Sequence, residues 1–206
     1  MIFSRLGLGA ARPSAERIAF ALGRPTPPRE GRLGRFARRP PRPCAGDRLY
    51  FAVRSVAASA REHVLQYAFA DDRGNVAASV FARSPSPVAL VLATPPHDLA
   101  VEPMEAGAVD ELVSRICRGA RLVTFHRVLQ AGLLPPAGLA AAGGVECAWR
   151  RFQRVAHTRG LRVDRGAPLS LADCLAQAGL APPPSEDAAL RALSVGELWR
   201  WMDEVE

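Results

Sequence analysis

The sequence predicts a single α/β or α+β sheet domain over residues 47–206, behind a basic arm formed by residues 1–46. Strand-like segments come first, and short strands then alternate with segments of helical periodicity. Prolines and arginines gather in the first 46 residues. The 206 residues, 49% of them hydrophobic and 23% charged, are typical of one globular domain with its own core.

The arm holds the net charge of the chain, which is +7 overall. The chain has no lysine, and ten of its 27 arginines lie in residues 1–46 against two acidic residues. The other 17 arginines face 18 acidic residues, so the domain itself is nearly neutral. Seven prolines remove backbone donors from the arm and its like charges repel. We therefore expect an extended, solvated arm with at most a short helix over residues 14–22.

Several classes of protein are not expected from this composition. No apolar run approaches the roughly 18 residues that a membrane helix needs, and the N-terminus lacks the apolar core of a secretory signal. The four cysteines are far apart without a CxxC pair, which favours neither a zinc site nor a disulfide framework. Reduced thiols indicate a cytoplasmic protein. An arginine-rich, acid-poor start is also typical of a mitochondrial transit peptide, which is the alternative.

The first half of the domain has the pattern of an antiparallel sheet. Strands are predicted over residues 49–56, 64–70 and 75–82, and the turn between the last two ends in Gly74, where a positive φ is easily adopted. A further strand over residues 88–94 would extend this sheet.

The second half alternates between helices and short strands. Strands are predicted at residues 122–125 and 145–148, with helices at 106–116, 128–134, 149–157 and 170–178. Pro135 and Pro136 end the second of these helices, and Gly179 ends the last. Ser185 is predicted to cap the C-terminal helix, whose apolar stripe would be Leu190, Leu193, Leu198, Trp201 and Val205.

Four segments in this order resemble the DnaQ-like (DEDD) 3′–5′ exonucleases. Residues 64–76 resemble the second strand, turn and third strand of that family, and residues 121–130 resemble its segment LVxHNxxFD. Residues 169–180 are similar to its SLxxLCxxLGI helix, and residues 187–192 stand where it has HxALxDA. The resemblance covers about residues 48–205. It implies an α/β ribonuclease H-like fold, with a mixed β-sheet flanked by helices in a single domain.

The resemblance also implies where a catalytic site would be. The family hydrolyses phosphodiesters with two magnesium ions, which four carboxylates hold while a histidine or tyrosine orients water. In this chain the Asp-x-Glu of the first strand falls on Ala52-Val53-Arg54. The later positions fall on Gln130, on Asp187 in place of the histidine, and on Ala192. All four metal-binding carboxylates are therefore replaced.

Electrostatics opposes metal binding at these positions. A unit charge 4 Å away contributes about 4 kcal/mol at an effective dielectric constant of 20, so a guanidinium opposes a divalent ion by roughly twice that. No acid lies between Arg48 and Arg61, so a shifted alignment does not restore the first motif. We expect no metal site and no cofactor; Mg²⁺ or Mn²⁺ would be needed only if the family's activity survives.

Each remaining candidate has a functional and a simpler interpretation. Arg54 could bind a phosphate or could pair with Asp187 or another carboxylate, and His126 could contact a nucleotide or could be an ordinary polar residue. Asp187 could be a residual ligand or could stabilise a helix N-terminus. Trp199 and Trp201 cannot share one helix face, so one of them could belong to a contact surface.

The arm has three interpretations. Its arginines, among them Arg35, Arg38, Arg39 and Arg42, could bind nucleic acid through counterion release, could be a solvated tail, or could bind a protein partner in an extended form.

The function predicted from the sequence is a catalytically degenerate 3′–5′ exonuclease homologue, which binds single strands or 3′ ends of nucleic acid without hydrolysis. The first alternative is a protein-interaction scaffold in a DNA- or RNA-processing complex. The second is an active, metal-dependent exonuclease with a rebuilt site. No membrane partner is expected, and oligomeric state is not encoded in any pattern.

Overall fold

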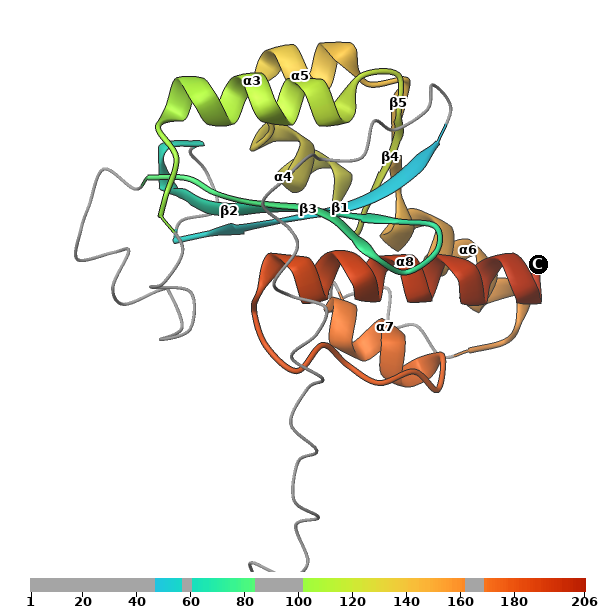
Figure 1. The fold of residues 1–206 in the computed structure, drawn as a ribbon. Coiled ribbons are helices and arrows are strands. Elements are labelled where there is room, and N and C mark those ends of the chain that lie inside the picture. The colour runs from blue at the N-terminus through green and yellow to red at the C-terminus, as the bar shows by residue number, and fades with distance from the viewer. Residues whose placement is uncertain (1–46, 57–60, 84–101, 162–168) are drawn as a thin grey trace, which may run out of the picture. The chain divides into compact units, whose positions relative to one another are not determined.

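The computed structural model describes residues 47–56, 61–83, 102–161 and 169–206. A five-stranded sheet in the order β3-β2-β1-β4-β5 lies at its centre (Figure 1). The strands are β1 (Arg48–Ser55), β2 (Val64–Asp71), β3 (Val76–Phe81), β4 (Arg121–Thr124) and β5 (Gly144–Cys147). The helices are α3 (Ala106–Cys117), α4 (Arg127–Gly132), α5 (Pro136–Ala141), α6 (Ala148–Thr158), α7 (Leu171–Gln177) and α8 (Ala188–Val205), with a 3-10 turn η2 (Arg61–His63) before β2.

The sheet is mixed, as the sequence predicts. The strands β1, β2 and β3 are antiparallel, whereas β4 and β5 run parallel to β1. Gly74 has a φ of +76° in the tight connection between β2 and β3, which is the conformation expected of it. In the register of β1 with β2, Ala52 lies opposite Ala68 and Arg54 lies opposite Gln66.

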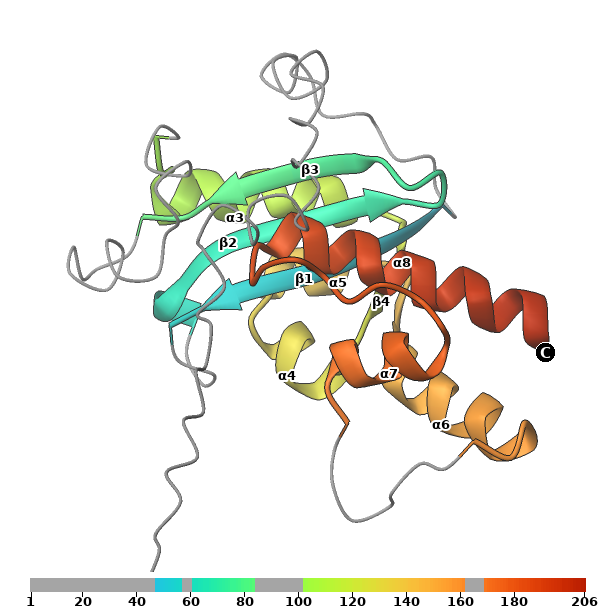
Figure 2. The ribbon, with the colours of Figure 1, turned by 90° about the horizontal axis from the view of Figure 1, so that it is seen from below.

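Helices cover both faces of the sheet. The helices α3 and α5 lie on one face and α6, α7 and α8 on the other, as two views at right angles show (Figures 1 and 2). Because side chains alternate along a strand, β1 contributes to two core clusters. Tyr50 and Ala52 pack in the cluster with α8, and Leu49, Phe51 and Val53 pack in the cluster with α3.

The helix α8 packs on the sheet largely through small side chains, and the predicted apolar stripe is confirmed only in part: of its five residues, Leu198 is fully buried. The buried positions include Ala192, Gly196 and Trp199, whereas Leu190, Leu193, Trp201 and Val205 are only partly buried. A Cβ at position 196 would lie 2.9 Å from Cδ2 of Tyr50, so only glycine allows this approach. Small residues bring the helix close, and hydrophobicity alone does not mark its buried face.

Two further predictions need correction. The helix α8 begins at Ala188 with Asp187 as its N-cap, two residues after the predicted cap Ser185. The helix α5 is absent from the predicted elements, because Pro135 and Pro136 are interpreted there only as the end of the preceding helix. Pro136 is instead the first residue of α5, where its missing N–H costs nothing.

Other elements agree with the sequence. Ser170 and Asp173 form a capping box at the start of α7, and Gly179 follows that helix with a φ of +73°. The predicted helix at 14–22 and the predicted strand at 88–94 lie outside the described residues. Within the described part of the chain, no helix is long and apolar enough to cross a membrane.

Candidate functional site

The positions on β1 and α8 that the exonuclease resemblance identifies lie toward the end of β1, on the sheet face that α8 covers. Ala52 and Arg54 are two residues apart on β1 and therefore point to the same face. Ala192 is on α8, and Gln130 reaches β1 from α4. The fold thus gathers positions that are up to 140 residues apart in the sequence.

Two of these positions are part of the apolar core. Ala52 is 5% exposed and Ala192 is 0% exposed, and both belong to the same buried cluster. Ala68, opposite Ala52 on β2, and Ala188 on α8 belong to it as well. The place where two metal-binding carboxylates would stand is therefore packed with methyl groups.

The side chain of Gln130 forms a hydrogen bond with the backbone of β1. Its Oε1 accepts a hydrogen bond of 2.7 Å from the backbone N–H of Val53. The strand β4 pairs with β1 only as far as Tyr50, so the amide of Gln130 binds a backbone donor beyond the end of that pairing. Its carbonyl oxygen is already a hydrogen-bond acceptor in the fold.

Asp187 is fixed at the start of α8. Its Oδ1 accepts from the backbone N–H of Ala189 (2.8 Å) and of Leu190 (3.2 Å), and its Oδ2 accepts from Nε2 of Gln66 (3.1 Å). The buried Gln66 also accepts from the N–H of Ala188 at 3.0 Å. One carboxylate oxygen therefore caps α8 and the other connects the start of the helix to β2. These contacts agree with the simpler interpretation, in which Asp187 stabilises a helix N-terminus.

An aromatic group lies next to these residues. The ring of His126, the residue before α4, is 4.5 Å from that of Phe125 and 6.0 Å from that of Trp149. Burial, and then the positive charge of Arg191 on α8, lower the pKa of His126. Its imidazole is therefore neutral at pH 7 and can accept one hydrogen bond.

The charges of this site nearly balance. Arg54 is half-buried opposite Gln66, and Arg191 forms an ion pair with Glu186. Together with Asp187 these residues sum to zero formal charge. The site is therefore far less acidic than one that holds two divalent ions, although it is not strongly positive.

These side chains do not fit a two-magnesium centre. Magnesium takes hard oxygen ligands, whereas the four carboxylate positions offer two methyl groups, a guanidinium and an amide oxygen that already binds the backbone. Among the residues that the structure describes, no three His, Cys, Asp or Glu side chains form a possible metal-binding group.

Sequence reasoning missed Gln66, Trp149 and Arg191 as neighbours of the site. Gln66 is a polar residue in an otherwise apolar strand, and Arg191 follows Asp187 by one helical turn, so both had a signal in the sequence. Trp149 had no such signal in the sequence, because its position depends on the direction in which α6 continues from the end of β5. The predicted nucleic-acid-binding residues Arg35, Arg38, Arg39 and Arg42 lie outside the described residues.

Comparison with known proteins gives structural neighbours only. No protein-family model matches the sequence, and no curated protein matches it significantly. The chain is similar to E. coli exonuclease I in its zinc-bound complex with single-stranded DNA, with a TM-score of 0.58 at 11% identity. It is also similar to E. coli exonuclease I with a dT13 oligonucleotide, with a TM-score of 0.57 at 12% identity. A product-bound exonuclease I has a TM-score of 0.51 at 12% identity.

The chain has a ribonuclease H-like fold. The fold class predicted from the sequence is thereby confirmed. Each of these matches covers 78% of this chain but only 41%, 41% and 46% of the exonuclease I chains, respectively. The chain thus spans less than half the length of the solved structures that it matches, and at this identity the likeness concerns the ribonuclease H-like fold alone.

Proposed function

We propose that this chain is a catalytically degenerate relative of the 3′–5′ exonucleases, which binds single-stranded nucleic acid without hydrolysing it. The observation that carries this proposal is the packing of Ala52 and Ala192 in one apolar cluster where metal-binding carboxylates would stand. The solved structures of exonuclease I with oligonucleotides support the nucleic-acid part, because they share the ribonuclease H-like fold.

The remaining side chains suit binding better than hydrolysis. Arg54 and Arg191 supply guanidinium groups that can donate to phosphate oxygens. Half-buried Trp149 and neutral His126 lie side by side and offer aromatic surface for a base. Hydrolysis by the family mechanism needs two metal ions to stabilise the attacking and leaving oxygens, and this chain has no ligand set for them among its described residues.

A paired assay tests both halves of the proposal. A 3′-labelled oligonucleotide with Mg²⁺ or Mn²⁺ is expected to release no mononucleotide. Fluorescence anisotropy with the same strand is expected to show binding that weakens steeply as salt rises. Arg54→Ala is expected to weaken it, whereas Arg118→Ala, at an exposed position just after α3, serves as the matched control.

Two results would contradict the proposal. Unchanged affinity of Arg54→Ala would remove this residue from the binding site. Metal-dependent release of mononucleotides that Asp187→Asn abolishes would instead support an active exonuclease with a rebuilt site. Asparagine is chosen because it keeps the acceptor for the N–H groups of the first helical turn and loses only the acceptor for Nε2 of Gln66, so the helix cap itself is retained.

A protein-interaction scaffold is the second candidate function. Val128 and Leu129 on α4 are 79% and 53% exposed, and an exposed apolar pair beside the site is a feature of contact surfaces. This alternative predicts that the chain binds no oligonucleotide at moderate salt but copurifies with a partner, and that Val128→Ser/Leu129→Ser releases that partner. The predicted role of the arm, residues 1–46, is tested in the same titration by its deletion.

A further inference from the structure

A basic surface lies beside the candidate site, in a pocket of about 440 Å³. We call it the arginine pocket. It is bordered by β5, α6, the C-terminal half of α8 and the first residues of β1 and α4. The residues that carry its chemistry are Arg48, Arg127, Arg150, Arg151, Arg154 and Trp199, together with the acids Glu146, Asp203 and Glu206.

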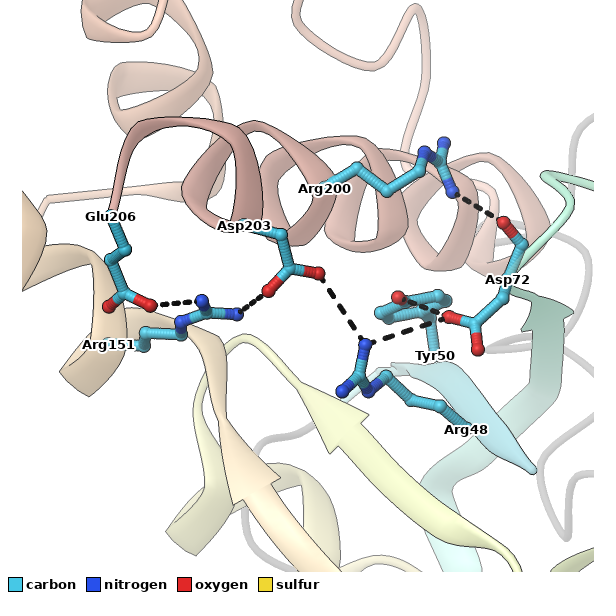
Figure 3. A network of polar contacts seen from close by, with 7 residues as sticks. All are labelled: Arg48, Tyr50, Asp72, Arg151, Arg200, Asp203 and Glu206. Atoms are coloured by element: carbon cyan, nitrogen blue, oxygen red, sulfur yellow. Dashed lines mark hydrogen bonds and ion pairs between the residues drawn. The ribbon is translucent and has the colours of Figure 1, made fainter. Parts of the chain in front are cut away.

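Two of the five arginines are engaged in an ion-pair chain. Arg151 binds Asp203 (2.6 Å) and Glu206, and Arg48 lies 3.6 Å from the other oxygen of Asp203 (Figure 3). The chain continues from Arg48 to Asp72, which accepts a hydrogen bond from Tyr50. These contacts fix the floor of the pocket and neutralise two of its three acids.

The other three arginines have no such partner. Arg127, Arg150 and Arg154 are exposed, and within the described ranges none of them forms an ion pair. The third acid, Glu146, has no ion pair there either, so the unpaired groups leave an excess of two positive charges. Arg150 and Arg154 are four residues apart on α6, where like charges repel. An anion between them would relieve this repulsion.

The floor of the pocket also contains two buried hydrogen-bond donors without acceptors. Trp199 is 3% exposed and lies against two guanidinium groups, with the Cζ atoms of Arg48 and Arg151 at 5.3 and 4.5 Å from its ring. Its indole Nε1 and the Nε of Arg48 are buried, and the described structure gives neither an acceptor. Indole and guanidinium groups donate hydrogen bonds and accept none. The exposed arginines of the pocket favour a ligand that is rich in acceptors and negatively charged, which describes a phosphate group.

We propose that the arginine pocket binds backbone phosphates of a nucleic-acid strand. A backbone is favoured over a free nucleotide because the pocket offers no open aromatic face for a base: its tryptophan is buried beneath two guanidinium groups. Arg127 follows His126 of the candidate site directly, so one strand can contact both places. This inference rests on the proposed nucleic-acid binding and supplies the positive charge that the candidate site itself lacks.

Salt dependence of binding tests this proposal. Each phosphate contact to a single strand contributes about 0.7 to the slope of log K against log salt, so the loss of two contacts lowers the slope by about 1.4. If the two proteins bind equally at 1 M salt, this difference in slope makes Arg150→Gln/Arg154→Gln bind a fluorescent 20-nucleotide oligo-dT about 25-fold more weakly than the wild type at 0.1 M salt. Arg73→Gln/Arg118→Gln removes the same charge at two exposed positions outside the pocket and is expected to keep the slope.

The outcomes are distinguishable. A pocket variant with the wild-type slope, while the wild-type chain still binds the strand, would overturn the pocket and leave the proposed function standing. A wild-type chain that binds no strand would overturn both. Calorimetric titration with ATP separates the two sources of phosphate. ATP binding that the pocket variant loses, with strand binding unchanged, would assign the pocket to a free nucleotide and overturn the proposal.

Discussion

Replacing Ala192 by aspartate would restore an acid at a position where the 3′–5′ exonucleases have one, yet we expect it to destabilise the chain and not to activate it. Ala192 is 0% exposed in the cluster that also holds Ala52. A carboxylate there would be buried among the apolar side chains of that cluster. Burial without a partner raises the pKa of the introduced carboxyl above its value in the unfolded chain.

The size of the effect follows from this burial. Complete burial penalises the ionised form of a carboxyl by about 4 kcal/mol relative to the protonated form. The penalty applies fully above the pKa of the folded state, and it disappears as the pH falls to the unfolded pKa near 4. At pH 7 the charge therefore costs about 4 kcal/mol. At pH 5, about one unit above the unfolded pKa, it costs about 1.5 kcal/mol.

Urea unfolding at pH 7 and pH 5 measures this difference. Ala192→Asn is the control, because it has the same shape without the charge and includes the cost of the larger side chain. Ala192→Asp is expected to be less stable than the control at pH 7 and to approach it at pH 5. Equal stability of the two variants at both pH values would show that position 192 faces solvent. It would refute the reasoning that core packing fills the place where the family's metal ligands would stand.

Three further predictions concern the residues around this site. Gln66→Met is expected to lower the free energy of unfolding by about 3 kcal/mol, since it removes three hydrogen bonds of about 1 kcal/mol each. Urea titration measures this free energy, and a decrease of less than about 1 kcal/mol would contradict the prediction. Arg191→Gln is expected to raise the pKa of His126 in an NMR titration, but only part of the way to its ordinary value, because burial is the larger cause; an unchanged pKa would exclude any influence of Arg191. Burial raises the pKa of the Cys117 and Cys174 thiols to about 12, so both are expected to resist a thiol reagent at pH 8 until the chain unfolds. Peptide mapping by mass spectrometry measures the labelling of each cysteine. Rapid labelling of either cysteine in the folded chain would contradict the prediction.

The sheet could be predicted because its signals are local. Residues 49–56, 64–70 and 75–82 have strand-like patterns, and Gly74 marks the turn between the last two strands. The packing of α8 on the sheet could not be predicted, because the close approach of the helix depends on the small residues Ala192 and Gly196, which do not contribute to a hydrophobic periodicity. Proline signals were also ambiguous, since a proline ends one helix and begins the next equally well.

The candidate site was predicted only in part. The motif positions Ala52, Gln130 and Ala192 could be assigned by resemblance, and the fold does gather them around the end of β1. Their roles could not be assigned, because a hydrogen bond such as that of Gln130 to β1 connects residues 77 positions apart in sequence. The arginine pocket was not predicted for the same reason: it combines one arginine from β1, one from α4 and three from α6.

The helix α8 is held on the sheet at three points. Gln66 binds its N-terminus, Gly196 lies against Tyr50 in its middle, and the Arg48 and Arg151 ion pairs bind its last turn. Any motion that lifted this helix would have to break all three sets of contacts together. The parts of the candidate site and of the pocket floor that α8 contributes are therefore preorganised, so a ligand would meet them in their final arrangement. Its association rate would then be governed by diffusion and charge, without a slower rearrangement of the protein.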